Sequence, residues 1–64
     1  SHSWRIGLHL PPVFFVDRWY VDWRSYRLAP PPWGCRWLRV DGDLYLVDER
    51  SGEILDALYG FFYY

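Results

Sequence analysis

Apolar and polar residues alternate most clearly in the C-terminal half of the chain, with the two-residue period of β-strands. Arg36–Val40 and Asp43–Val47 are both rich in leucine, valine and aromatic residues. The dipeptide Asp41-Gly42 separates them and favours a two-residue type I′ turn, because Asp and Gly tolerate the positive φ that both positions need. The pattern therefore predicts an antiparallel hairpin over residues 36–47.

This turn also fixes which residues oppose each other across the hairpin. The predicted pairs are Val40 with Asp43, Leu38 with Tyr45, and Trp37 with Leu46. Leu38 and Tyr45 then share one face of the hairpin, while Trp37 and Leu46 share the other. Because both faces carry apolar side chains, we expect the N-terminal half of the chain or a second subunit to cover one of them.

A second turn and a third strand are predicted to follow. Glu49-Arg50-Ser51-Gly52 is a turn sequence in which Gly52 suits a left-handed conformation. Residues 53–59 then return as a third strand, although the apolar residues within 54–58 also fit one turn of helix. The predicted fold class is mainly β, a small antiparallel β-meander.

The N-terminal half has weaker signals. Residues 4–10 are predicted to be extended as far as Pro11-Pro12, which cannot donate hydrogen bonds to a ladder. Val13–Val16 and Trp19–Trp23 have the composition of short strands. A single helical turn over residues 22–26, with Tyr26 packed inward, is the alternative for the second of these segments.

Two further segments have a distinct composition. Pro30-Pro31-Pro32 predicts a rigid, extended connector between the two halves, because proline fixes φ and has no N–H to donate. The tail, residues 59–64, is too apolar for a solvated chain end. We expect it to pair with the N-terminal strand or with another chain, since an open aromatic edge favours aggregation.

Aromatic residues are abundant for so short a chain: five Trp, six Tyr and four Phe among 64 residues. A chain of this length forms one domain, which we place at residues 4–64, while residues 1–3 resemble a remnant of expression. So small a core cannot bury every aromatic ring. We therefore expect an exposed aromatic patch or a subunit contact, which makes a homo-oligomer a candidate assembly.

The charges nearly balance, with seven basic and eight acidic residues. This balance argues against a nucleic-acid partner, which would select a basic surface. All seven basic residues are Arg, and Arg stacks well on aromatic rings, so we expect Arg-aromatic ladders across the strands. The chain has no apolar run of about 18 residues, and hence no predicted transmembrane segment.

Nucleophilic chemistry has little support in the sequence. A single cysteine, Cys35, excludes an intrachain disulfide and a multi-thiolate zinc site. It lies in a strand-like run, where we expect a passive small side chain. Only the tertiary structure could bring Cys35 beside His9 as a base, and no local motif indicates such a pair. We therefore do not expect an enzyme, and we assign no catalytic residue.

A divalent metal is the remaining candidate ligand. Imidazole and carboxylate groups suit nickel and cobalt, and the chain offers His9, Asp41, Asp43, Asp48 and Glu49 as candidate ligands. The spacing of these residues matches no tight site such as His-x-x-x-His, so binding is expected to be weak. Carboxylates at hairpin tips are usually solvated, and ordinary surface charge is the simpler interpretation.

One family resemblance extends over nearly the whole chain. Its residues are Leu10-Pro11, Val21-x-Trp23, Tyr26-Arg27-Leu28, Pro31-Pro32-x-Gly34, Arg36-Trp37-Leu38-Arg39-Val40, Gly42-Asp43 and Ser51-Gly52-x-Ile54. In this order they resemble the RcnB family, small bacterial envelope proteins linked to the regulation of nickel and cobalt efflux. The chain departs from the family pattern at Cys35, where Tyr is usual, and at Ser51, where Thr is more familiar.

The resemblance implies a periplasmic protein, exported by a signal peptide that is absent from this sequence and joined to a variable polar linker. It implies a non-enzymatic role in nickel and cobalt homeostasis, through weak metal contact or through contact with an envelope protein. It assigns no metal ligand and no certain cofactor. The alternative function is a general envelope interaction module without a metal role, whose exposed aromatic residues or strand edge bind another protein or a second copy.

Overall fold

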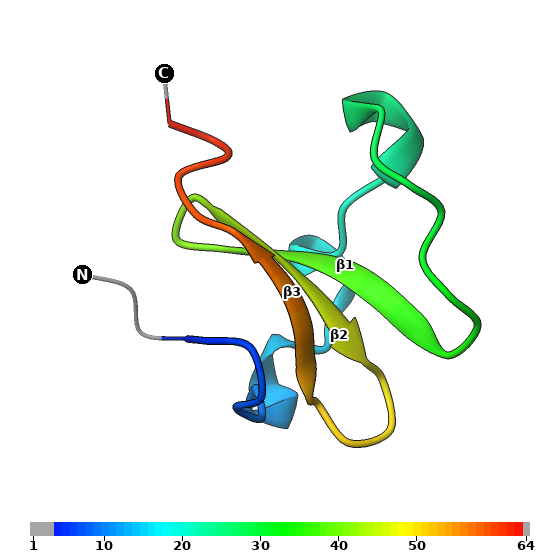
Figure 1. The fold of residues 1–64 in the computed structure, drawn as a ribbon, viewed down its shortest axis with the longest axis vertical. Helices are drawn as coiled ribbons and strands as arrows, with labels where there is room; N and C mark the ends of the chain where they lie inside the picture. Colours follow the sequence, from blue (N-terminus) through cyan, green and yellow to red (C-terminus); the bar gives the residue numbers. More distant parts are fainter. Residues whose placement is uncertain (1–3, 64) are drawn as a thin grey trace.

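Three antiparallel strands in the order β1-β2-β3 form the sheet of this protein in a computed structural model that describes residues 4–63 (Figure 1). β1 is Cys35–Val40, β2 is Asp43–Asp48 and β3 is Ile54–Leu58. The predicted fold class, a mainly β meander, is confirmed. The expression remnant predicted at residues 1–3 lies outside the described residues.

The β1–β2 hairpin forms as predicted. Asp41 and Gly42 occupy the turn with φ of 53° and 87°. All three predicted cross-strand pairs are present: Val40 with Asp43, Leu38 with Tyr45, and Trp37 with Leu46. The short turn and the alternation of side chains are enough to fix this register.

The third strand also forms, and the helical alternative for residues 54–58 is wrong. Gly52, with φ of 78°, turns the chain back beside β2. Val47 then pairs with Ile54 and Leu46 with Asp56, which leaves one extra residue in β3 as a β-bulge. Burying Ile54 completely against β2 stabilises the strand more than one isolated helical turn could.

Both faces of the sheet are covered by other parts of the same chain. On one face, Leu38, Tyr45 and Ile54 are fully buried beneath the N-terminal half. The residues of that half that pack there are Trp4, Leu10, Phe14, Phe15, Trp19 and Tyr20. On the other face, Trp37 and Leu44 are buried against the tail and residues 21–28. The expectation that the N-terminal half covers a face is confirmed.

The strands predicted for the N-terminal half are wrong at most positions. Val13–Val16 and Trp19–Trp23 are replaced by three 3₁₀ turns: η1 (Pro12–Phe14), η2 (Asp17–Trp19) and η3 (Trp23–Tyr26). Residues 4–10 likewise form turns, with a single bridge from His9 to Glu53. Strand pairing in the middle segment is limited to a bridge between Tyr20 and Leu38.

Local hydrogen bonds explain why the helical alternative for residues 22–26 is the correct one. The Asp22 carboxylate accepts hydrogen bonds from the Arg24 N–H and the Ser25 hydroxyl, which caps η3. Arg27 then ends the turn with φ of 56°. Tyr26 packs edge-on against the rings of the tail but remains 44% exposed, so its predicted inward packing is only partial.

The proline connector is extended and is tied to the sheet. Residues 28–32 form no regular element. The Trp37 indole Nε1–H donates to the Ala29 carbonyl at 3.0 Å, which fixes the start of the proline run. The Cys35 N–H donates to the Pro32 carbonyl at 2.9 Å and closes the turn that enters β1. These contacts support the interpretation of the run as a rigid connector.

The tail folds over the hairpin turn (Figure 1). Its predicted strand pairing with the N-terminal segment is wrong for the described residues, although the Tyr59 hydroxyl donates to the Trp4 carbonyl at 2.7 Å. The Phe62 N–H donates to the Gly42 carbonyl at 3.0 Å, and the Tyr63 hydroxyl donates to the Asp41 carbonyl at 2.7 Å. Gly60 reverses the chain with φ of 69° after β3. Pairing of the tail with another chain remains a prediction.

The N-terminal segment instead reaches the β2–β3 turn at Gly52, and this approach can be tested. A methyl group at Gly52 would lie 2.6 Å from the Leu10 carbonyl oxygen. Gly34 has a similar φ of 83°, but nothing lies within 4 Å of a methyl group there. Both alanine variants should therefore lose about 1–2 kcal/mol of unfolding free energy to left-handed strain.

We expect Gly52→Ala to lose clearly more unfolding free energy than Gly34→Ala, because the Leu10 backbone must also move. Urea denaturation of the two variants and the wild-type chain measures the difference. Equal losses would show that the N-terminal segment does not lie against Gly52.

Candidate functional site

The five candidate metal ligands lie at two ends of the molecule. Asp41 lies in the β1–β2 turn and Asp43 begins β2 just after it, whereas Asp48 ends β2 and Glu49 begins the β2–β3 turn. β2 separates the two pairs by five residue steps, which is roughly 16 Å at the usual rise of a strand. One ion therefore cannot bind both pairs.

Asp43 is a buried structural residue with only 6% of its surface exposed. Its carboxylate accepts hydrogen bonds from the Gly60 N–H at 2.7 Å and from the Tyr45 hydroxyl at 3.3 Å. Burial and the nearby Asp43 charge raise the pKa of the Tyr45 phenol. The expectation that hairpin-tip carboxylates are solvated is wrong for Asp43, because the tail folds over it.

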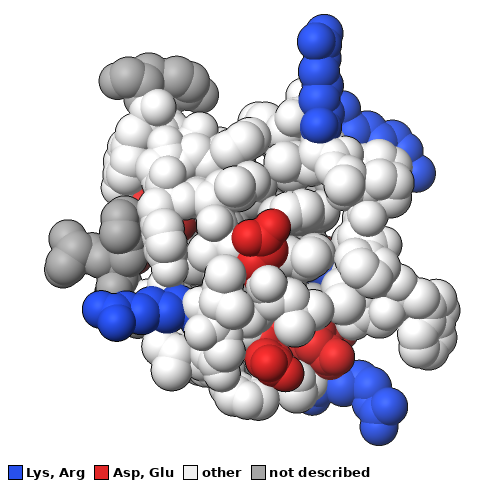
Figure 2. Space-filling model, viewed as in Figure 1, with Lys and Arg blue, Asp and Glu red and all other residues white. Residues whose placement is uncertain are grey.

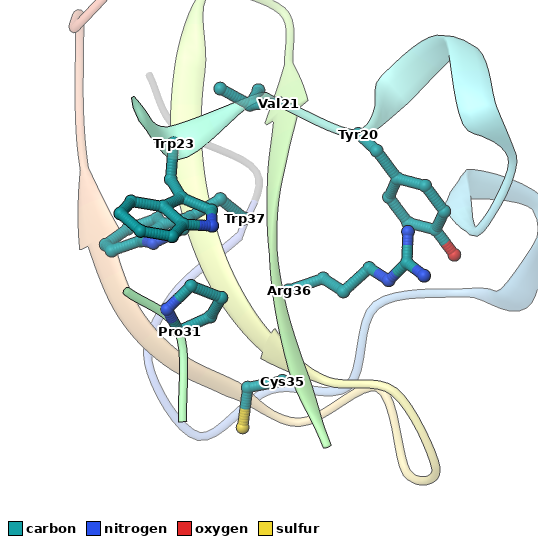
Figure 3. Close-up of a pocket in the computed structure, with 7 residues that line it drawn as sticks. All are labelled: Tyr20, Val21, Trp23, Pro31, Cys35, Arg36 and Trp37. Atoms are coloured by element: carbon teal, nitrogen blue, oxygen red, sulfur yellow. The ribbon is translucent and has the colours of Figure 1, made fainter. Parts of the chain in front are cut away.

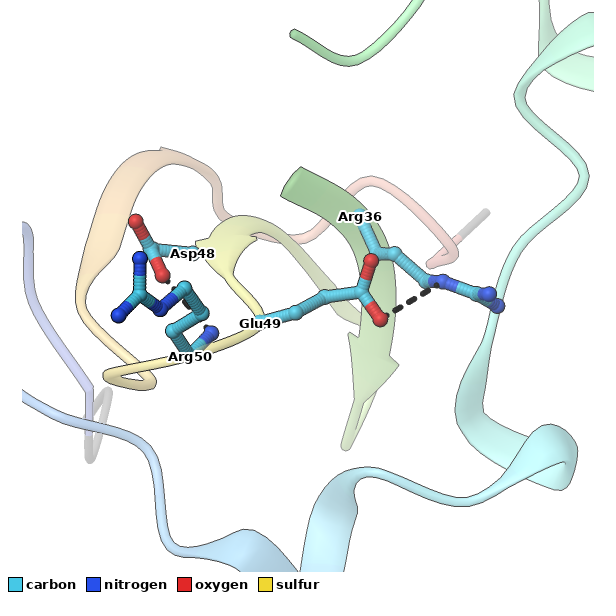
Figure 4. Close-up of polar contacts among 4 residues, drawn as sticks. All are labelled: Arg36, Asp48, Glu49 and Arg50. Atoms are coloured by element: carbon cyan, nitrogen blue, oxygen red, sulfur yellow. Dashed lines mark hydrogen bonds and ion pairs between the residues drawn. The ribbon is translucent and has the colours of Figure 1, made fainter. Parts of the chain in front are cut away.

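Asp48 and Glu49 are neighbours in sequence, but their side chains point apart (Figure 4). The Asp48 carboxylate accepts hydrogen bonds from the backbone N–H groups of Arg50 and Ser51 at 2.8 and 3.1 Å. Glu49 instead forms an ion pair with Arg36, with 3.2 Å between Nε and Oε2. The Asp48 carboxylate therefore stabilises the turn, and the Glu49 carboxylate pairs with an arginine on the surface of the sheet.

His9 is exposed beside the same turn. Its Nδ1 lies 2.9 Å from the Ser51 carbonyl oxygen. A carbonyl can only accept, so Nδ1 carries the proton and Nε2 carries the lone pair in the neutral ring. A backbone carbonyl orients many metal-binding histidines in this way. Within residues 4–63, however, no three His, Cys, Asp or Glu side chains gather closely enough to hold one ion.

Cys35 is half-buried at the start of β1. Burial, together with the negative charges of Asp48 and Glu49, raises the pKa of its thiol. The thiol therefore stays protonated at neutral pH, which disfavours both nucleophilic attack and metal binding. The groove that Cys35 lines does not include His9, so this cavity does not unite the two.

A small groove of about 180 Å³ lies along β1 (Figure 3). Its main lining residues come from three separate segments: Tyr20, Trp23, Pro31, Cys35, Arg36 and Trp37. The sequence did not predict this groove, because its walls meet only when the connector and η3 fold beside β1. The only sign of it in the sequence was that the chain has more aromatic residues than so small a core can bury, which indicated an exposed aromatic surface without placing it.

Arginine side chains stack on aromatic rings near this groove. The guanidinium of Arg36 lies 4.2 Å from the centre of the Tyr20 ring, and that of Arg24 lies 4.3 Å from the Trp23 ring. The predicted Arg-aromatic contacts are present, but they do not form ladders across the strands: Arg36 joins β1 to the segment at Tyr20, whereas Arg24 stacks on its neighbour Trp23 within η3. Figure 2 shows arginines projecting from the periphery of one face, with acidic side chains nearer its centre.

Comparison with known proteins identifies the family. The model of the RcnB family, described as nickel/cobalt transporter regulator, matches residues 7–56. This chain belongs to the RcnB family. The resemblance drawn from the order of its motifs is thereby confirmed, and the family is one of regulators.

A solved structure supports the RcnB fold described above. It is 25% identical in sequence, with a TM-score of 0.79, and the similarity covers 95% of this chain and 76% of that one. No curated protein matches the chain. The helical turns of this RcnB domain within residues 4–63 are all too short to cross a membrane.

The Asp48 cap gives a pH-dependent prediction. Its hydrogen bonds from Ser51 and Arg50 hold the pKa of the carboxyl below its usual value. A depressed folded-state pKa means that the cap stabilises the fold above about pH 4 and that this contribution disappears as pH falls through the folded pKa. We expect Asp48→Asn to lower the melting temperature at neutral pH, with the difference shrinking as the pH falls through the folded-state pKa of Asp48.

Thermal denaturation followed by circular dichroism across this pH range measures the effect. Asp17→Asn is the control, since Asp17 is an exposed carboxylate in η2. A loss in Asp48→Asn that is the same at all pH values would show that the carboxylate charge does not support the turn.

Proposed function

We propose that this domain is a non-enzymatic regulator of nickel and cobalt homeostasis in the bacterial periplasm, and that it acts by contacting another protein chain. The observation that carries the proposal is the RcnB family match over residues 7–56. Membership in a family of transporter regulators supports a role in metal homeostasis. The groove along β1 and the structural roles of the carboxylates support action through contact with another protein chain.

Contact with protein is favoured over tight metal binding because most candidate ligands already have structural roles. Asp43 holds the tail, Asp48 caps a turn, and Glu49 pairs with Arg36. A metal ion would have to break these contacts before it bound, and each carboxylate would then leave its partner unpaired. The groove along β1, in contrast, is lined by the aromatic and arginine side chains that are enriched at protein interfaces.

His9 is the candidate for direct but weak metal contact. Its ring is exposed and oriented by Ser51, with Nε2 directed away from that hydrogen bond. A single imidazole completed by water suits nickel or cobalt, but it provides too few protein ligands for a tight site. Any metal contact by the domain is therefore loose and local.

The regulatory role predicts a cellular phenotype. In a bacterium that encodes this chain, deletion of its gene should change the nickel and cobalt content of cells grown with added metal. Expression of the wild-type chain should restore the original content. Metal content is measured by mass spectrometry of washed cells. An unchanged content would reject the metal role and favour a general envelope interaction module.

The mode of metal contact predicts a distinct result for the purified domain. In a nickel titration followed by amide NMR, line broadening should be confined to residues around His9 and Ser51, without saturation at stoichiometric metal. His9→Ala should abolish the broadening, and magnesium should cause none. Stoichiometric saturation centred on the Asp41–Asp43 turn or on Asp48 and Glu49 would contradict the proposal.

A further inference from the structure

Trp33 is the most prominent exposed apolar side chain of the described residues, with 97% of its surface accessible. It lies on the turn that joins the proline connector to β1. A large apolar side chain in this position gains nothing from folding, because its surface stays in water. Removing that surface from water requires a partner.

The turn that carries Trp33 is held in place from several sides. The Cys35 N–H donates to the Pro32 carbonyl, and the Glu49 N–H donates to the Gly34 carbonyl, each at 2.9 Å. Ahead of it, three prolines restrict the backbone. The indole is therefore presented on an ordered turn, so binding through it costs less conformational entropy than binding through a flexible loop.

The groove along β1 lies next to this turn. Pro31 and Cys35, which are two residues before and two residues after Trp33, both line the groove. Its walls include Trp23 and Trp37, and the Arg36 guanidinium lies over Tyr20 at one side (Figure 3). Such walls suit an aromatic ring, through edge-to-face packing and cation–π contact. Because Trp33 is almost fully exposed, it does not fill the groove of its own chain.

We propose that two copies of this chain associate by reciprocal insertion, with Trp33 of each copy in the β1 groove of the other. Trp33 lies between the groove residues Pro31 and Cys35 in the chain, and a single two-fold axis can satisfy both insertions and close the assembly as a dimer. The net charge of −1 per chain opposes this approach very little.

The area available indicates a weak and reversible dimer. Each inserted tryptophan removes at most about 150–250 Å² of its own surface from water. With the flanking prolines, the total falls below the roughly 1,200 Å² at the lower end of stable interfaces. We expect a dissociation constant between about 1 μM and 1 mM.

This inference deepens the proposed function, since it names a second copy as the chain that the aromatic surface contacts. It rests on that proposal for its biological role only. The association is measured on purified protein without metal. If the purified protein stays monomeric, the dimer proposal fails but the role in metal homeostasis can still hold. If deletion of the gene does not change the metal content of the cells, the metal role fails but a measured dimer still stands.

Sedimentation velocity from micromolar to millimolar concentration tests the dimer directly. We expect the wild-type chain to shift from monomer to dimer, and Trp33→Ala to weaken association by at least about tenfold. Trp33 contributes little to the core, so this variant should keep the wild-type melting temperature. Val13→Ala is the matched control, because Val13 is 71% exposed on η1 and should leave association unchanged.

A second variant tests the groove separately from the inserted Trp33 side chain. Cys35→Phe places a ring in the groove while leaving Trp33 in place. This variant should not associate alone, but its mixture with Trp33→Ala should form a heterodimer through one remaining insertion. Labelling only the Cys35→Phe chain with 5-fluorotryptophan reports the burial of its Trp33 as a ¹⁹F shift that depends on the Trp33→Ala concentration.

Two results would overturn the inference. One is a wild-type chain that stays monomeric at millimolar concentration. The other is a dimer that Trp33→Ala and Cys35→Phe both form as well as the wild-type chain does, which would place the interface elsewhere. If Cys35→Phe fails to fold, the comparison of Trp33→Ala with Val13→Ala still decides between these outcomes.

Discussion

Apolar side chains on both faces of a sheet of three short strands impose the main constraint on this protein. Such a sheet is not stable in water with an apolar face exposed. The chain covers the Leu38 and Tyr45 face with its N-terminal half, and it covers the Trp37 and Leu44 face with residues 21–28 and Phe62. Irregular segments thus supply much of the core, and their placement beside β1 creates the groove.

Polar side chains hold these irregular segments in place, and some of the candidate ligands are among them. The Asp43 carboxylate fixes the start of the tail at Gly60, and the Trp37 indole fixes the connector at Ala29. Asp48 holds the turn that the N-terminal segment crosses at Gly52. A domain this small has little stability to spare, so the hydrogen bonds that these carboxylates accept matter for its fold.

The surface left exposed after folding carries large apolar side chains, Trp33 foremost, together with all seven arginines. Rigid presentation of Trp33 next to a groove of matching chemistry is a typical arrangement for protein recognition. In a family of transporter regulators, such a surface suits a protein that works through contacts between chains. His9 and Trp33 lie on different segments of the chain, so the proposed metal contact and the proposed protein contact can be tested separately.

Short-range patterns in the sequence determined the hairpin, its register and the family, whereas for residues 54–58 they favoured a strand but left a helical turn open. Asp41-Gly42 alone specifies the turn geometry, and the two-residue alternation assigns Leu38 and Trp37 to opposite faces, because both signals act between neighbouring residues. Only the tertiary structure decided that 3₁₀ turns replace the strands predicted at Val13–Val16 and Trp19–Trp23 apart from one bridge at Tyr20, that the tail buries Asp43, and that a groove opens along β1. These features depend on contacts between residues far apart in the chain, where local propensity is weak and the best burial of the sheet determines the conformation.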